Sequence, residues 1–158
     1  MNRRSLTLAL FAATLSLSAS AGQFACPELA AAVQVNACPT EEELRFTYNG
    51  YCSDNAKAYA NQTDSCIRYE DYRAMKNTAR WESKDGEFDA YVSCDLPAGT
   101  FKGLKATSMK VVPQGKLTKL VCTYPRGINF TYRTKGACKL VDEKACAADA
   151  GNCQAACD

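Results

Sequence analysis

Histidine is absent from the 158-residue sequence, and its absence narrows the chemistry that the protein can perform. Serine hydrolases of the common type and papain-like cysteine proteases each need a histidine as general base. Histidine is also the commonest side chain at catalytic metal centres. We therefore exclude the enzyme classes that rely on imidazole, and we expect neither catalytic activity nor a cofactor.

Long apolar runs, phosphate-binding loops and internal repeats are also missing. The longest mostly apolar run, residues 6–17, is shorter than the roughly 20 residues that a membrane-spanning helix needs. The sequence contains no glycine-rich phosphate loop and no Gly-x-Ser-x-Gly nucleophile motif. We therefore expect a chain that does not span a membrane, and its length suits one domain.

Residues 1–21 have the composition of a secretory signal peptide. Arg3 and Arg4 supply the positive start, the apolar run follows, and Ala19-x-Ala21 is a cleavage signal. We expect export, to a bacterial periplasm or out of the cell, as a monomeric single domain of residues 22–158. The 19 basic residues less the two leader arginines leave 17, against 17 acidic residues. Net charge alone therefore favours neither nucleic acid nor a membrane surface as partner.

Ten cysteines follow the expected cleavage site, and in an exported protein this even number predicts up to five disulfides. None of them forms a Cys-x-x-Cys pair, and only Cys153-x₃-Cys157 approaches the spacing of structural zinc ligands, so we expect no metal. A lipid anchor on Cys26 is a weaker alternative, because the residues before it lack the expected leucine. The cysteines are Cys26, Cys38, Cys52, Cys66, Cys94, Cys122, Cys138, Cys146, Cys153 and Cys157.

Helix-forming patterns precede residue 86. Pro27 suits a helix start, and residues 28–33 are good helix formers. Thr40 and Glu43 have the spacing of a capping box, which predicts a short helix after residue 40. Apolar residues recur at three- and four-residue steps over residues 67–80, which predicts a longer helix.

Strand patterns follow residue 86. Phe88, Ala90 and Val92 alternate with polar residues, as in a half-buried strand. The four expected strands cover residues 88–94, 104–112, 117–124 and 128–134. The tail, residues 142–158, is rich in alanine and cysteine and favours a helix. We therefore predict a disulfide-stapled α+β domain, with short N-terminal helices, a four-stranded antiparallel meander over residues 87–134 and a Cys-rich C-terminal helix.

Cys94 and Cys122 fall at apolar positions of two of these strands, so both side chains should point into the core. Facing strands could bring their Cα atoms within the roughly 4.4–6.8 Å that a disulfide requires. We predict this pair first, and the spacing leaves the other pairings open.

Residues 81–140 also carry a resemblance. Trp81, Phe101, the segment Val121-Cys122-Thr123-Tyr124 and the expected strand over 128–132 are similar to small exported bacterial domains of uncharacterised function. In those domains a tryptophan strand precedes a Cys-x-Tyr strand hairpin. The resemblance implies an exported β-rich domain and no assigned activity or site residue.

Charge is distributed unevenly along the chain. Residues 26–95 hold 13 acidic and 7 basic residues, whereas residues 96–158 hold 4 acidic and 10 basic residues. The stretch from 96 to 141, here called the acid-free stretch, contains nine bases and no Asp or Glu. On the expected strands Lys119, Arg133 and Lys135 share the outward parity, which predicts a basic face on the sheet.

Three functions remain open. The leading hypothesis is a non-enzymatic interaction module that binds an anionic protein or envelope component through this face, with the disulfides keeping it rigid. Nucleic acid is disfavoured, because the bases are mostly lysine and no RNA-binding aromatic motif occurs. The alternatives are a secreted effector or toxin, and a glycan hydrolase using carboxylates. Its candidate acids are Glu82, Asp85, Glu87 and Asp89. A structural explanation of the bases, as partners of the acidic half or guards of strand edges, also stays open.

Overall fold

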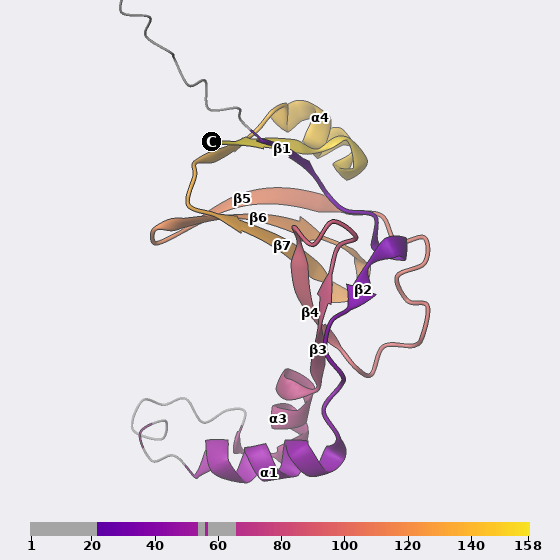
Figure 1. The fold of residues 1–158 in the computed structure, drawn as a ribbon, viewed down its shortest axis with the longest axis vertical. Coiled ribbons are helices and arrows are strands. Elements are labelled where there is room, and N and C mark those ends of the chain that lie inside the picture. The colour runs from indigo at the N-terminus through magenta and orange to yellow at the C-terminus, as the bar shows by residue number, and fades with distance from the viewer. Residues whose placement is uncertain (1–21, 54–55, 57–65) are drawn as a thin grey trace, which may run out of the picture.

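Two antiparallel sheets lie on either side of the hydrophobic core (Figure 1). The computed structural model describes residues 22–53, 56 and 66–158, and the expected signal peptide, residues 1–21, lies outside the described residues. The larger sheet has the strand order β2-β3-β4-β7-β6-β5, and the smaller sheet has the order β1-β9-β8. The larger sheet consists of β2 (Val33–Gln34), β3 (Thr78–Glu82), β4 (Asp89–Ser93), β5 (Ser108–Gln114), β6 (Leu117–Thr123) and β7 (Asn129–Thr134). The smaller sheet consists of β1 (Gly22–Ala25), β8 (Cys138–Leu140) and β9 (Gln154–Cys157).

Buried and exposed side chains alternate along the strands of the larger sheet. In β6 Leu120 and Cys122 are fully buried, and in β7 Phe130 is fully buried. Lys119 and Arg133, at the opposite parity, lie on the outer side. Successive side chains of a strand point to opposite faces, so these apolar residues form one inner face that packs on the smaller sheet.

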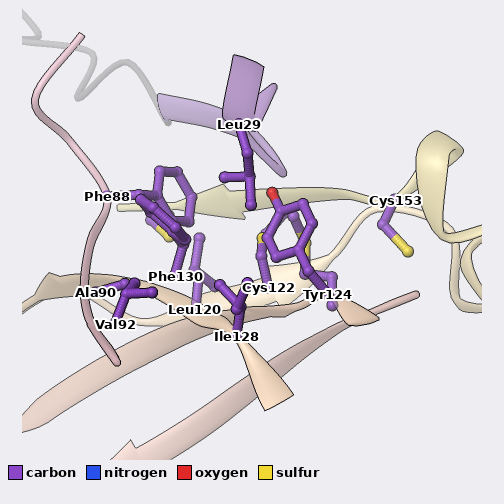
Figure 2. Packing of buried hydrophobic residues seen from close by; sticks show 13 residues of the cluster. Leu29, Phe88, Ala90, Val92, Leu120, Cys122, Tyr124, Ile128, Phe130 and Cys153 are labelled. Carbon is purple, nitrogen blue, oxygen red and sulfur yellow. The ribbon is translucent and has the colours of Figure 1, made fainter. Parts of the chain in front are cut away.

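The core fills the space between the two sheets (Figure 2). Leu29, in the short 3₁₀ turn η1 (Leu29–Ala31), points toward the side chains that rise from the larger sheet, among them Phe130 and Tyr124. The Tyr124 hydroxyl donates a hydrogen bond to the Pro27 carbonyl oxygen at 2.5 Å. Burial raises the pKa of Tyr124 well above its ordinary range, so the phenol stays a donor at all physiological pH values.

Three helices complete the described part of the structure. They are α1 (Glu41–Cys52), α3 (Tyr69–Lys76) and α4 (Glu143–Ala148). The capping box at the start of α1 is confirmed, because Thr40 accepts a bond from the Glu43 N–H and Glu43 accepts one from the Thr40 N–H. Tyr48 of α1 packs on Tyr72 of α3 with ring centroids 5.3 Å apart, so the two helices form a small unit at one end of the larger sheet (Figure 1).

The expected mixture of helices and antiparallel strands is confirmed, but the four-stranded meander is wrong. Strands form in each of the four expected places, yet β4 pairs with β7 instead of with β5. Two further strands, β2 and β3, extend this sheet, and three others form the smaller one. Local alternation predicts a strand but carries no information on its neighbour, which is chosen by tertiary packing.

Two expected helices are shorter than predicted, and a third is replaced by a turn. The helix expected over residues 67–80 is α3, which ends at Lys76. Ala79, expected on the apolar face of that helix, is instead a buried residue of strand β3. Residues 28–33 form only η1 and the start of β2. The C-terminal tail forms the six-residue helix α4 and then β9, which pairs with both β1 and β8.

All ten cysteines form disulfides, as expected. The predicted pair Cys94–Cys122 is wrong, although Cys122 does point into the core. β7 lies between β4 and β6, so Cys94 and Cys122 would be about two strand spacings, roughly 9–10 Å, apart on one face of one sheet. The five pairs are Cys26–Cys122, Cys38–Cys94, Cys52–Cys66, Cys138–Cys157 and Cys146–Cys153.

A charged cluster joins the helical unit to the sheet. Arg73 of α3 donates two hydrogen bonds of 2.9 Å to the carboxylate of Asp95, just after β4. Asn77 donates a third bond to Asp95 at 3.0 Å, and Arg73 also lies 3.3 Å from Glu41 of α1. The Arg73 guanidinium and the Asn77 amide hold the pKa of Asp95 below its ordinary value of 3.8.

Acid should loosen this connection, and Asp95→Asn should remove part of the acid sensitivity. Because the folded-state pKa of Asp95 is lowered, its contribution is present above its unfolded pKa of about 4 and is lost as the pH falls through the lowered value. Urea unfolding at a series of pH values should therefore show a smaller loss of stability in the variant than in the wild type as the pH falls below about 4. An identical pH dependence in both proteins would contradict this role of Asp95.

Within the described residues, no helix has the length and apolar character that crossing a lipid bilayer requires.

Candidate functional site

Lysine and arginine side chains lie on the outer side of β5, β6 and β7. Lys110 in β5, Lys119 in β6 and Arg133 in β7 all have the parity opposite to the buried residues of their strands. Lys119 and Arg133 are directly opposite each other in the β6–β7 ladder. Side chains at such paired positions are about 5 Å apart at their Cβ atoms, so the two positive charges share one patch of surface.

Two further lysines extend this patch at the ends of the strands. Lys116 lies in the two-residue turn between β5 and β6, where Gly115 adopts a φ of +60°. Lys135 follows the last residue of β7, Thr134, which pairs with Thr118 near the start of β6. Lys135 is thus exposed in a bend and lies outside the strand on which its outward parity was predicted. We call Lys110, Lys116, Lys119, Arg133 and Lys135 together the basic face.

Arg133 is neutralised by an acid from the other half of the chain. Its guanidinium forms an ion pair with Asp89 of β4, which also lies 3.3 Å from Arg80 of β3. Arg80 in turn pairs with Glu82 at 2.9 Å. The outer side of the larger sheet is therefore an alternating ionic network over β3, β4 and β7, and the uncompensated positive charge begins at β6.

The remaining bases of the acid-free stretch lack such partners. Within the described part of the chain, Arg133 is the one base of this stretch that forms an ion pair with a side-chain carboxylate within 4.0 Å. The eight others are Lys102, Lys105, Lys110, Lys116, Lys119, Arg126, Lys135 and Lys139. The acidic half of the chain thus neutralises one of nine positive charges, and the acidic residues Glu41, Asp71 and Asp95 pair with arginines of their own half.

Protection of strand edges against aggregation explains only a small part of the distribution of these basic residues. β5 is an edge strand of the larger sheet, so Lys110 is placed where lysines commonly hinder edge-to-edge aggregation. Lys119 lies on β6, which is flanked by β5 and β7, and Arg133 lies on β7, which is flanked by β6 and β4. Neither position is at an edge.

Of the four carboxylates considered for a glycan hydrolase, Glu82, Asp85 and Asp89 form ion pairs or hydrogen bonds with neighbouring side chains, and Glu87 is exposed between β3 and β4. Glu82 and Asp89 are directly opposite each other on β3 and β4, and Arg80 lies between them. Asp85 accepts a hydrogen bond of 2.5 Å from the Ser83 hydroxyl in the turn between these strands, and this bond lowers the pKa of Asp85. A general acid needs a raised pKa, which is the opposite shift.

Reasoning from the sequence found the lysines but missed Asp89 as the partner of Arg133. This partner can be identified only from the strand order, because the pairing of β4 with β7 brings Asp89 and Arg133 together. Alternation within each strand shows which face a residue occupies, and it leaves open which strand lies beside it.

Comparisons with protein-family models, with curated proteins and with solved structures find no match to this chain. The resemblance of residues 81–140 to small exported bacterial domains therefore remains a prediction.

Proposed function

We propose that this protein is an exported, non-enzymatic binding module whose basic face docks onto an anionic protein or an anionic component of the cell envelope. The observation that carries the proposal is that, within the part of the chain that the structure describes, eight of the nine bases in the acid-free stretch have no carboxylate partner within 4.0 Å. An uncompensated patch of one sign raises the local concentration of oppositely charged partners and speeds their association.

Rigidity of the sheet supports this function. The inner residues of β6 and β7 are fully buried, and Cys122 of β6 is bonded to Cys26, which follows β1 of the smaller sheet. The backbone that carries Lys119 and Arg133 is therefore held in place before any partner arrives. A preorganised surface loses little conformational freedom on binding, which favours affinity.

Five disulfides also support the proposed export. Disulfides persist in oxidising compartments such as the bacterial periplasm and the extracellular space. A signal peptide over residues 1–21 would deliver the chain there, and the domain that follows contains all ten cysteines.

Charge reversal on the basic face should abolish most of the binding to polyanions. The variant Lys119→Glu/Lys110→Glu changes two lysines that form no ion pair within the described residues. It spares Arg133, whose replacement would remove one of the two ion pairs of Asp89. We expect its affinity for immobilised lipopolysaccharide, or for polyglutamate as an acidic polypeptide, to fall by about tenfold or more. Surface plasmon resonance at rising salt should show wild-type binding weakening as the Debye length falls from about 10 Å at 0.1 M to about 3 Å at 1 M.

Lys84→Glu/Lys144→Glu is the matched control, because it makes the same change in net charge at exposed lysines outside the basic face. Binding of this control should stay close to that of the wild type. Equal loss in both variants would show that net charge alone drives binding. No binding to either probe, or full binding by the Lys110/Lys119 variant, would contradict the proposal.

A further inference from the structure

A cavity of about 700 Å³ lies on the inner side of the larger sheet, away from the basic face. Its lining comes from η1, β2, β3, the end of β4 and the loop over residues 96–102. No residue of the smaller sheet lines it. The cavity therefore occupies the part of the inner face over β2, β3 and β4, which η1 and the 96–102 loop cover in place of β1, β8 and β9.

Apolar side chains that are anchored in the core form the walls. Trp81 of β3 packs edge-on against Phe101 with ring centroids 4.5 Å apart, and Phe101 in turn contacts the buried Phe130 at 6.1 Å. Leu29 and Val92, also in the lining, are almost fully buried. These contacts hold the aromatic wall in one arrangement, so the cavity exists before a ligand enters.

A disulfide is also part of the lining. Cys38 and Cys94 are bonded to each other, and both line the cavity. The bond ties the segment after β2 to the end of β4, so the mouth cannot open by separation of these two elements. Ligand sites in proteins are commonly preformed, largely apolar cavities of roughly 300–1,000 Å³ with a few polar groups, and this one has those properties.

The charge of the lining has one sign. Among the described residues that line the cavity, Lys102 is the single charged one, and none is Asp or Glu. Lys102 is exposed, and within the described residues its ammonium group has no carboxylate within 4.0 Å. A ligand with an acidic group would therefore find an available cation at the mouth, whereas a cationic ligand would find only repulsion.

We propose that this cavity binds a small amphipathic anion, with an unbranched apolar body against Trp81 and Phe101 and a carboxylate at Lys102. Medium-chain fatty acids have this chemistry. The body removes apolar surface from water, and the charge-assisted hydrogen bond to Lys102 orients the ligand with its head group at the mouth. This site is independent of the basic face and does not rest on its function.

Trp81 offers a direct readout, because it is the single tryptophan of the chain and lines the cavity. Decanoate, titrated below its micelle-forming concentration, should change the emission of Trp81 with saturation at one ligand per protein. Decan-1-ol should bind more weakly by about tenfold, which is the typical effect of losing one charge-assisted contact. Decylamine should neither change the emission nor displace decanoate.

Two substitutions separate the head group from the apolar body. Lys102→Met should weaken decanoate binding about tenfold and leave decan-1-ol binding unchanged, since only the charge is lost. Ala98→Phe places a large side chain at an exposed position of the rim and should weaken both ligands. Circular dichroism and melting temperature of each variant, measured beside the wild type, establish that the comparison is between folded proteins.

Two controls guard against nonspecific binding. Lys105→Met removes an exposed lysine just beyond the 96–102 loop, outside the lining, and should bind decanoate as the wild type does. The Lys110→Glu/Lys119→Glu variant should also bind decanoate normally, which distinguishes this site from the basic face.

Unchanged Trp81 emission with decanoate, or wild-type binding of decanoate by Ala98→Phe, would overturn the proposal of a ligand site in this cavity. Equal effects of Lys102→Met and Lys105→Met, or binding of decylamine as tight as that of decanoate, would overturn the assignment of the head group.

Discussion

Replacing both Cys26 and Cys122 with alanine should lower the free energy of unfolding by about 4–5 kcal/mol, the largest effect we expect from removal of any one disulfide. This bond closes the longest loop in the molecule, with a sequence separation of 96 residues. A longer closed loop removes more conformational freedom from the unfolded chain, so its release costs more stability. The bond also joins the two sheets, because Cys26 follows β1 of the smaller sheet and Cys122 lies in β6 of the larger sheet.

The matched control removes Cys146 and Cys153, which are separated by only 7 residues. Its expected cost is about 2–3 kcal/mol, so the two variants should differ by about 2 kcal/mol in urea unfolding followed by circular dichroism. Equal costs would contradict the loop-length explanation. Peptide mapping of the native protein without reduction should recover Cys26 linked to Cys122, and recovery of Cys122 linked to any other cysteine would overturn this pairing.

Phe130→Ala should lower the free energy of unfolding by about 3–5 kcal/mol. Phe130 is fully buried at the centre of the core, where its ring contacts those of Tyr124 at 6.0 Å and Phe101 at 6.1 Å. Truncation leaves a cavity between the sheets, and the disulfide at the neighbouring Cys122 limits how far the strands can move to fill it. The loss is measured by the urea midpoint at unchanged slope.

Thr131→Ala, one residue along the same strand, is the control for this substitution. Thr131 lies on the outer side and is only half-buried, so its replacement should change stability by less than about 0.5 kcal/mol. The emission of Trp81 adds a second readout, because Phe101 links Phe130 to Trp81. A cost below about 1 kcal/mol for Phe130→Ala would contradict the central position of this ring in the core.

The helix start at Thr40 and the turns of the sheet follow from local chemistry and could be predicted. The capping box satisfies backbone donors with side chains three residues away, so it needs no tertiary partner. At residues 125–127, where Pro125 and Gly127 are typical turn residues, Arg126 and Gly127 adopt positive φ angles of 65° and 73°. Asn49-Gly50, a pair typical of tight turns, instead lies inside α1, because packing of α1 on α3 outweighs the local preference.

The candidate site could be predicted in part, because the face that a strand residue occupies also follows from local pattern. Alternation along β6 and β7 is enough to place Lys119 and Arg133 on the outer face, and the register sets them opposite each other. The partner of Arg133 could not be found this way, because Asp89 is 44 residues away and reaches it only through the β4–β7 pairing. The cavity beside Trp81 could not be predicted from the sequence either, since its walls come from three separate parts of the chain, residues 29–38, Trp81 and residues 92–102.

Composition and short-range pattern thus determined the cysteine chemistry, the approximate positions of β4, β5, β6 and β7, the inward direction of Cys122 and the stretch without acids. These properties depend on residues close together in the chain, or on residue counts alone. Tertiary structure decided the strand order, the disulfide partners, the ion pair of Arg133 and the cavity. Each of these depends on which segments become neighbours. That arrangement is set by the total burial of apolar surface in one core, to which strands of both sheets contribute together.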